Sequence, residues 1–341
     1  MEKESAGTTG NEIKTDSRKR VFAYCGIIFV IIAWGVYPIF TSDLLTYYSG
    51  GMYSFVSSLI AAVALLLICI PKRKLLNGSY FRVAVPTGFF VALANLLQKI
   101  GLQYTTPTQY AFLENLSCVV VPVLLFLFIR KRPGLLTVTA SVLCLVGCFV
   151  LSGLDFSGGG VSFGKGEILC ALAGVMYGVN IAATGVYAKK LNAMLYVMIQ
   201  MWIHVLVSGV AAVALDRITV NGAPIEAIVF SWDWKYLFSI AVLVLSISTF
   251  GWIIRTEALK YVNASVVAVL MPFSSVVTGV VAVCVGKDLF AFHLLLGGLM
   301  ILISSILSSV ADVIDHQRSE IKECGEKSER GAYGDNGDGN G

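Results

Sequence analysis

Charged residues are scarce in this chain. Asp, Glu, Lys and Arg make up 13% of its 341 residues, against about 25% in soluble domains, while 57% of residues are hydrophobic. Too few polar side chains remain to cover a soluble protein of this length. The charges gather in the end segments 1–20 and 311–341, and the middle holds one apolar run after another. These features predict a polytopic membrane protein with two solvated tails.

The residues that build metal sites and catalytic centres are also few. Three histidines are scattered, and eight cysteines form no C-x-x-C pair; seven of them lie in apolar runs, where cysteine packs as a small apolar residue. We find no H-E-x-x-H, no G-x-x-x-x-G-K-[ST] and no lipidation motif. We therefore expect no metal, no cofactor, no catalytic residues and no ATP-driven pump, and a membrane-embedded enzyme is disfavoured. The mild net charge of +4 gives no reason to expect a nucleic-acid partner.

Ten apolar segments are long enough to cross a bilayer, which takes about 20 residues per helix. A helix is expected for each, because it satisfies its backbone polar groups internally. No removable signal peptide is visible before the first of them. The predicted spans are residues 21–40, 51–70, 83–103, 107–129, 135–153, 164–187, 193–215, 236–258, 264–285 and 290–310.

The distribution of Lys and Arg predicts the side that each loop faces. With a cytoplasmic N-terminus, the inner segments hold 20 of the 25 basic residues and the outer ones hold four, with Lys99 inside a span. Cytoplasmic loops are the ones rich in Lys and Arg. We therefore expect both termini in the cytoplasm and the protein in the cytoplasmic (plasma) membrane.

The second half of the chain repeats the first. "GLQYTTPTQYAFLENL" (101–116) aligns with "ALKYVNASVVAVLMPF" (258–273) at a constant offset of 157, which pairs Tyr104 with Tyr261. "AWGV" in the first span resembles "MYGV" in the sixth. The repeated unit is five helices, an odd number, so the second copy must cross the membrane in the opposite direction. Inverted repeats with a site near the midplane are characteristic of secondary transporters.

With these motifs the sequence resembles the drug/metabolite transporter superfamily, in particular its ten-helix EamA-type members. The resemblance rests on Trp34-Gly35, on the two aligned junction motifs and on Gly286-Lys287-Asp288 after the ninth span. It implies an all-α polytopic membrane protein with ten transmembrane helices as two inverted five-helix repeats. The corresponding segments are a tail (1–20), a first repeat (21–153), an extracytoplasmic linker (154–163), a second repeat (164–310) and a disordered cytoplasmic tail (311–341).

The resemblance further implies a carrier of small metabolites, often an exporter, that works by alternating access. The chain departs from the family where an acidic residue after the fourth helix is replaced by Lys131, so the substrate is not carried over. We expect a small-molecule substrate and lipid as partners, and a monomer or homodimer. A channel remains an alternative, and saturable flux with counterflow would distinguish a carrier from it.

Two charges inside apolar spans need an explanation, Lys99 and Glu114. An ionised side chain there is costly unless it is paired, reaches water or serves a function. The third and fourth spans are antiparallel neighbours, so the two side chains are close enough to pair. Three interpretations stay open: an ion pair or a snorkelling Lys99, a shared cavity that binds the charged ends of a substrate, or a proton-coupling role for Glu114.

Other polar and aromatic residues within spans are candidate substrate ligands, although packing and interhelical hydrogen bonding are alternatives for each. With Lys99 and Glu114, the predicted substrate-binding set comprises Trp34, Asn95, Asn180, Gln200, Trp252 and Arg255. One acid, one or two bases, amides and aromatics suit a small zwitterion such as an amino acid or related metabolite. The basic residues could instead serve an organic anion or phosphate ester, and two or more of them facing one cavity would favour the anion.

Overall fold

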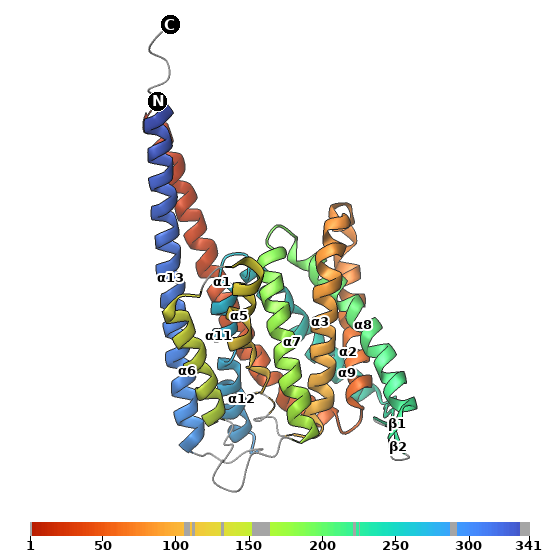
Figure 1. The fold of residues 1–341 in the computed structure, drawn as a ribbon. Helices are drawn as coiled ribbons and strands as arrows, with labels where there is room; N and C mark the ends of the chain where they lie inside the picture. Colours follow the sequence, from red (N-terminus) through yellow and green to blue (C-terminus); the bar gives the residue numbers. More distant parts are fainter. Residues whose placement is uncertain are drawn as a thin grey trace.

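The computed structural model describes residues 2–105, 110, 113–130, 133–151, 164–220, 223–224, 226–286 and 292–334. The described residues form a bundle of helices and one short hairpin, whose two strands have two residues each (Figure 1). The elements are α1 (Glu2–Leu44), α2 (Gly50–Cys69), a 3-10 turn (Ile70–Leu75), α3 (Gly78–Leu102), α5 (Ser117–Ile129), α6 (Leu135–Leu151), α7 (Lys165–Tyr187), α8 (Ala193–Arg217), β1 (Thr219–Val220), β2 (Ala223–Pro224), α9 (Trp234–Leu243), a π-helical segment (Val244–Thr249), α10 (Phe250–Ala258), α11 (Ala264–Leu270), α12 (Phe273–Cys284) and α13 (Phe292–Gly334).

The predicted fold class is confirmed. Among the described residues, eight helical stretches are long and apolar enough to cross a membrane, and two shorter apolar helices, Ser117–Ile129 and Leu135–Val150, complete the predicted ten. The eighth span is α9, the π-helical segment and α10 in one continuous run, and the ninth is α11 followed by α12. The predicted linker (154–163) and part of the junction before α5 lie outside the described residues.

Polar N-caps set where several spans begin. The Asn77 side chain accepts from the Ser79 N–H before α3, and Asn192 accepts from Met194 and Leu195 before α8. These bonds satisfy backbone donors that a helix start leaves without a partner. The chain therefore enters these spans at defined residues, which sets the register of the side chains that follow.

The C-terminal segment differs from the sequence prediction. A disordered tail was expected from residue 311, but α13 continues as a helix to Gly334. The sequence offers a reason, because Glu323 and Lys327, and Glu326 and Arg330, have the i,i+4 spacing that favours helix. At the other end of the chain, α1 likewise includes most of the predicted tail.

The helices of the two halves contact one another in matching pairs. The third span packs on the sixth (α3 on α7), and its counterpart, the eighth, packs on the first (α10 on α1). The fourth packs on the sixth (α5 on α7), and the ninth on the first (α12 on α1). The second packs on the seventh and the fifth on the tenth, so each of these two pairs joins repeat counterparts. This is the pattern that a pseudo-two-fold relation between the halves requires.

Two glycines show the same relation at atomic detail. A Cβ on Gly178 in α7 would come 2.7 Å from Val120 Cγ1 in α5, and one on Gly35 in α1 would come 2.5 Å from Val277 Cβ in α12. Val120 and Val277 are related by the sequence offset of 157. Each half therefore uses a glycine to bring a broken span close against a helix of the other half.

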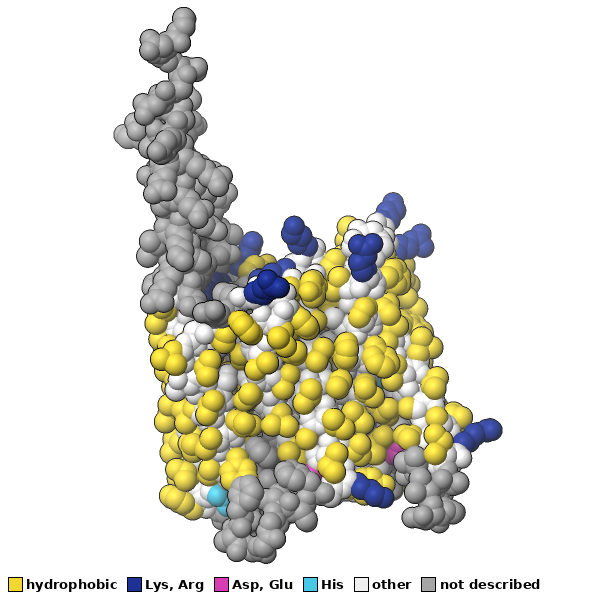
Figure 2. All heavy atoms as spheres, in the orientation of Figure 1, with side chains coloured by type: hydrophobic (Ala, Val, Ile, Leu, Met, Phe, Trp, Pro, Cys, Tyr) yellow, Lys and Arg dark blue, Asp and Glu magenta, His cyan; other side chains and the backbone are white. Residues whose placement is uncertain are grey.

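The outer surface agrees with a membrane setting. Hydrophobic side chains cover the visible flank, and most of the visible Lys and Arg gather at the end of the bundle from which α1 and α13 emerge (Figures 1 and 2). We call this the tail end; exposed Lys72, Arg130 and Lys189 belong to it. The opposite loop end holds exposed Lys165 and Arg217. The chain is thus a multi-pass membrane protein with most of its basic residues at one end.

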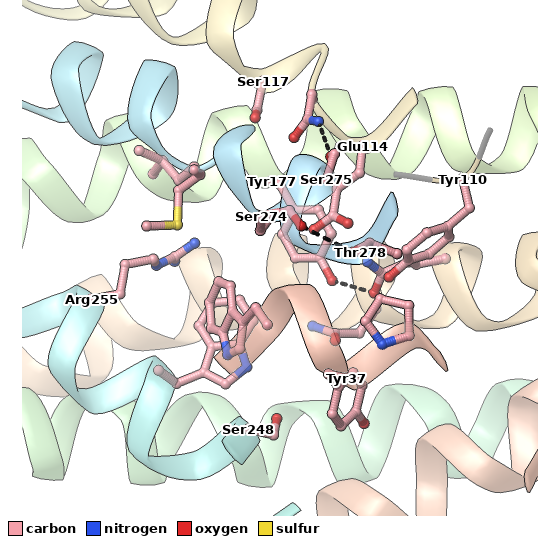
Figure 3. Close-up of a pocket in the computed structure, with 18 of the residues that line it drawn as sticks. Tyr37, Tyr110, Glu114, Ser117, Tyr177, Ser248, Arg255, Ser274, Ser275 and Thr278 are labelled. Carbon is pink, nitrogen blue, oxygen red and sulfur yellow. Dashed lines mark hydrogen bonds between the residues drawn. The ribbon is translucent and has the colours of Figure 1, made fainter. Parts of the chain in front are cut away.

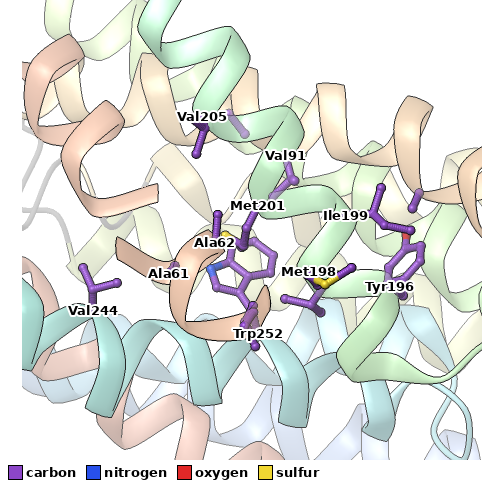
Figure 4. Close-up of a cluster of buried hydrophobic side chains, with 14 of the residues drawn as sticks. Ala61, Ala62, Val91, Tyr196, Met198, Ile199, Met201, Val205, Val244 and Trp252 are labelled. Atoms are coloured by element: carbon purple, nitrogen blue, oxygen red, sulfur yellow. The ribbon is translucent and has the colours of Figure 1, made fainter. Parts of the chain in front are cut away.

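A core of buried side chains packs α2, α3, α8 and the eighth span together (Figure 4). Met198 and Met201 of α8 and Val91 of α3 lie beside Trp252 of α10 in this cluster. Trp252 is 5% exposed, and its ring also faces the central cavity. The core therefore holds in place one of the aromatic walls of the candidate site.

Candidate functional site

A cavity lies between the two halves of the bundle (Figure 3). Side chains from α1, α3, α5, α7, the π-helical segment, α10 and α12 line it, together with the residues just before α5. Of the eight predicted ligands, it brings together six: Trp34, Asn95, Lys99, Glu114, Trp252 and Arg255.

Two broken spans border this cavity. The fourth span is interrupted at Asn115–Leu116, and the ninth at Met271–Pro272, positions that the offset of 157 relates closely. Pro272 favours the break in the ninth span because proline lacks a backbone N–H. Asn115, in the break of the fourth span, donates to the hydroxyl of Ser275 just after the other break, at 2.6 Å. Non-helical backbone within a membrane is tolerated where it lines a cavity, and discontinuous helices form many transporter sites.

Lys99 lies three residues from the loop end of α3 and is 4% exposed. Its Nζ lies 4.6 Å from the centroid of the Tyr37 ring and 5.8 Å from that of Tyr53, within the range of a cation–π interaction. No salt bridge joins it to Glu114 in the described part of the chain. The structure therefore contradicts the ion-pair interpretation and, since Lys99 is buried, the snorkelling one as well.

Glu114 lies in the short segment before the break of the fourth span. Its carboxylate faces Gln98 and Tyr110, and Gln98 in turn accepts from the Tyr177 hydroxyl at 2.8 Å. Gly174 of α7 makes room for this segment, because a Cβ there would collide with the backbone oxygens of Leu113 and Glu114. Glu114 is thus held in the cavity wall with its carboxylate directed at hydrogen-bonding side chains.

Arg255 occupies the other end of the cavity, three residues from the tail end of α10. Its Cζ lies 4.3 Å from the Trp252 ring centroid and 5.8 Å from that of Trp34. Its Nη2 donates to the Asn180 Oδ1 at 2.5 Å, and its Nε has no partner among the described residues. Only 2% of the residue is exposed, so its guanidinium lies inside the bundle and does not reach the interface.

The aromatic rings form a continuous wall. Trp34 and Trp252 lie 5.1 Å apart between ring centroids, and the Tyr177 ring stacks on Trp252 at 6.1 Å. Ring pairs at these separations attract one another beyond simple burial. The wall offers a ligand an apolar face beside the Arg255 guanidinium.

The structure places Asn180 and Gln200 behind the cavity rather than in it. Asn180 is fully buried and donates to the Thr87 carbonyl at 3.0 Å, and Gln200 donates to the Thr87 hydroxyl at 3.0 Å. Their side chains join α3, α7 and α8. Direct contact with a substrate, as predicted from the sequence, is therefore not possible for them in this structure.

Sequence reasoning did not select several residues that the cavity contains: Gln98, Tyr110, Ser117, Tyr177, Ser274, Ser275 and Thr278. The signal for Tyr177 was present, because it takes the place of Trp34 in the "MYGV" copy of "AWGV". The serines follow Pro272 in "PFSSVVTG", at the break of the ninth span. No group of three potential metal ligands occurs among the described residues.

Comparisons with known proteins agree with this architecture. A sequence model of the EamA-like transporter family matches residues 21–153 and again 164–310. A curated relative, an uncharacterized transporter of Archaeoglobus fulgidus, is 27% identical over 175 residues, which make up 51% of this chain and 52% of the relative. The chain thus spans about half the length of that relative.

A solved crystal structure superposes with a TM-score of 0.67 at 12% sequence identity, over 86% of this chain and 99% of the other. That likeness shows the fold alone. The family match is broader, since it covers most of the chain in two copies, one for each half of the bundle. The resemblance noted in the sequence is therefore confirmed, and the chain belongs to the EamA-like transporter family.

Proposed function

We propose that this protein is a secondary carrier that moves a small solute bearing an anionic group across the membrane by alternating access. The observation that carries the proposal is the pair of buried cations in one cavity between the two halves. Lys99 and Arg255 both rest on aromatic rings, and neither has a salt-bridge partner in the described residues. An isolated buried charge is costly, and an anionic ligand would supply the missing partner.

A zwitterion such as an amino acid fits this arrangement. Arg255 offers a planar donor for a carboxylate, Glu114 offers an acceptor for an ammonium group, and the wall of Trp34, Trp252 and Tyr177 takes an apolar side chain. The hydroxyls along α12 add donors and acceptors for orientation. An amino acid or a related amphiphilic metabolite is therefore the first candidate substrate.

An organic anion or a phosphate ester is the second candidate. The observation in its favour is the count of charges: Lys99 and Arg255 face the cavity against one carboxylate, Glu114. A solute with two negative charges would use both cations. The two candidates differ in whether the substrate needs an ammonium group, which a flux assay can decide.

Different contacts tie the two halves of the chain together at the two ends of the bundle. At the tail end, Asp312 of α13 accepts from Arg20 at 2.6 Å and from Tyr24 at 2.9 Å, and it also bonds Asn263. At the loop end, Tyr48 donates to the Ser231 carbonyl at 2.7 Å. Each set ties α1 or its following turn to the second half of the chain.

A second hollow at the tail end supports an inner route. Gly185, Val266 and Asp312 line it, and a buried apolar layer that includes Ile181 and Met271 separates it from the central cavity. We infer that transport opens this layer after release of the Asp312 contacts. With the basic tail end in the cytoplasm, the inferred direction is export across the cytoplasmic membrane.

The test is counterflow in proteoliposomes. Purified protein is loaded with one unlabelled solute at a time, and uptake of trace labelled solute is followed for amino acids, dicarboxylates and sugar phosphates. A carrier gives saturable uptake and a transient overshoot with its own substrate. Flux that rises linearly with concentration and shows no overshoot would indicate a channel, and it would overturn the proposal.

Glu114 is tested as the proton-coupling site in the same vesicles. Glu114→Gln should abolish uptake driven by a pH gradient while solute exchange continues. Glu167→Gln is the matched control, because Glu167 lies outside the cavity, where its carboxylate accepts from Thr105 at 2.7 Å. Gradient-driven uptake that survives intact in Glu114→Gln would show that the proton uses another group.

A further inference from the structure

The buried polar network behind Arg255 joins three helices, α3, α7 and α8. Asn180 of α7 donates to the Thr87 carbonyl of α3, and the Thr87 hydroxyl contacts the Tyr196 hydroxyl of α8 at 2.7 Å. Tyr196 also contacts Thr184 of α7 at 2.9 Å, and Gln200 donates to Thr87. All five side chains are buried. The network therefore fixes the orientation of each member.

This network determines which atom Asn180 presents to Arg255. A carbonyl oxygen can only accept, so the Asn180 amide nitrogen must face Thr87 and its Oδ1 must face the cavity side. There Oδ1 accepts from Arg255 Nη2 at 2.5 Å. The guanidinium is thus oriented by a neutral amide on one side and stacked on Trp252 on the other.

Because Asn180 is neutral, it does not cancel the positive charge of Arg255. A carboxylate at position 180 would form a buried ion pair with Arg255 and compensate its charge, because opposite charges interact strongly away from water. The amide accepts the same hydrogen bond and leaves the positive charge uncompensated. Among the described residues, the salt bridges are Arg20–Asp312 and Lys260–Glu257, and neither involves Arg255.

We propose that Asn180 is the specificity-determining positioning residue of the carrier. It holds Arg255 toward the cavity and keeps its charge available, so the site at this end selects solutes with a carboxylate or another anionic group. The inference rests on the proposed function, since it assigns the anion preference of that site. Gln200 supports the arrangement through Thr87 and does not contact the solute.

The substitution Asn180→Asp tests this directly. Small probes are titrated against purified protein, namely benzoate, its neutral analogue benzamide and inorganic phosphate, with tryptophan fluorescence as the readout. The Trp252 and Trp34 ring centroids lie 4.3 and 5.8 Å from Arg255 Cζ, so occupation beside the guanidinium changes their emission. Wild type should respond to benzoate at saturation and should bind benzamide at least about tenfold more weakly.

The benzoate affinities of two Asn180 variants distinguish an effect of charge from a loss of structure. Asn180→Asp should weaken benzoate binding at least about tenfold, whereas Asn180→Ala, which removes more atoms but adds no charge, should lose only about threefold. Asn192→Asp is the matched control. It makes the same chemical change at the N-cap of α8, where the side chain accepts from backbone N–H groups, and it should bind like wild type.

The results can distinguish a failure of the role proposed for Asn180 from a failure of the proposed anion site. If wild type binds benzoate but Asn180→Asp binds it within about twofold of wild type, the role of Asn180 is overturned and the proposed function stands. The same conclusion follows if Asn180→Ala loses as much affinity as Asn180→Asp, because a structural role then suffices. If wild type discriminates neither benzoate nor phosphate from benzamide, the anion site itself is refuted.

Discussion

Lys99 and Arg255 occupy opposite ends of one cavity, in opposite halves of a repeated fold. Each is buried, lies near a helix end and rests on two aromatic rings. Their polar neighbours differ: Lys99 has the carboxylate of Glu114 in its vicinity, whereas Arg255 is hydrogen-bonded to the neutral amide of Asn180. The same arrangement of cation and rings therefore holds a cation near a carboxylate at the loop end and one hydrogen-bonded to a neutral amide at the tail end.

The repeat does not explain this likeness. By the offset of 157, Arg255 corresponds to Gln98 and Lys99 to Thr256, so the two cations are one residue apart in the aligned halves. The shared fold provides two equivalent places at the cavity, and the charges that fill them arose at neighbouring positions. An inverted repeat can thus keep its architecture while its two ends take up different chemistry.

The largest expected effect comes from removing one cation at a time. Arg255→Gln should lower Vmax/KM for the transported anion about 100-fold, and Lys99→Gln about tenfold, because a hydrogen bond to a charged group contributes about 1.5–3 kcal/mol. The smaller effect at Lys99 reflects the nearby Glu114, which already offsets its charge. The measurement is initial uptake into proteoliposomes against concentration.

Uptake measured from each side of the membrane separates the roles of Arg255 and Lys99 further. In vesicles of defined orientation, Arg255→Gln should raise KM mainly for solute added at the tail end, and Lys99→Gln mainly for solute added at the loop end. The control for a general loss of positive charge is Lys165→Gln, because Lys165 is exposed. Equal losses for both cations from both sides would show that the cavity acts as one undivided site.

A second prediction compares the two glycine contacts. Gly35→Ala should destabilise the protein by about 1–3 kcal/mol, the usual cost of overpacking, and Gly178→Ala by less. The reason is that a Cβ on Gly35 would also come 2.7 Å from the Ser274 backbone oxygen, which moves only with α12. Thermal unfolding in detergent measures both, with Gly78→Ala as control because nothing lies near its Cβ position. A larger loss at Gly178 would refute this ranking.

The smallest expected effect lies at the loop end. Burial raises the pKa of the Glu226 carboxyl above its usual 4.5, while N–H groups of Gly51 and Gly50 oppose this shift. Folding therefore favours the protonated form, so the contribution of Glu226 to stability is full below pH 4.5 and is lost as the pH rises through the raised pKa. Glu226→Gln, which still accepts from Gly51, should remove this loss.

The measurement is the melting temperature of wild type and Glu226→Gln across this pH range. The difference between the two should grow in favour of the variant as the pH rises. Asp216→Asn is the matched control, because Asp216 accepts from Ile228 in the same loop at 3.0 Å. Parallel pH profiles for wild type and Glu226→Gln would contradict the prediction.

The sequence predicted the membrane spans well because their signal is local. Runs of apolar residues can be read from consecutive positions, and the repeat from the constant offset of 157. The break at Pro272 carries a signal too. The break at Asn115–Leu116 has no proline and depends on packing against Gly174 and on the bond to Ser275, which only the folded chain shows.

The site was predicted in part. Residues such as Trp34, Lys99 and Arg255 were identifiable because charges and large aromatics are unusual inside spans. Helical periodicity could not place Asn180 behind the cavity, because that depends on which neighbour its helix meets. Likewise, the depth of Lys99 suggested a pair with Glu114, but the Tyr37 and Tyr53 rings come from spans whose packing the local pattern does not specify.

The excess of one positive charge in the cavity has an electrical consequence. With Glu114 ionised, the empty cavity holds Lys99 and Arg255 against one carboxylate, and a bound monoanion makes the loaded cavity neutral. Moving one elementary charge through the full membrane potential is worth about 2.3 kcal/mol per 100 mV. In the proposed carrier with a monoanionic solute, the membrane voltage would then act on the return of the empty protein and hardly on the loaded step. The potential would set the turnover rate without acting on the solute itself.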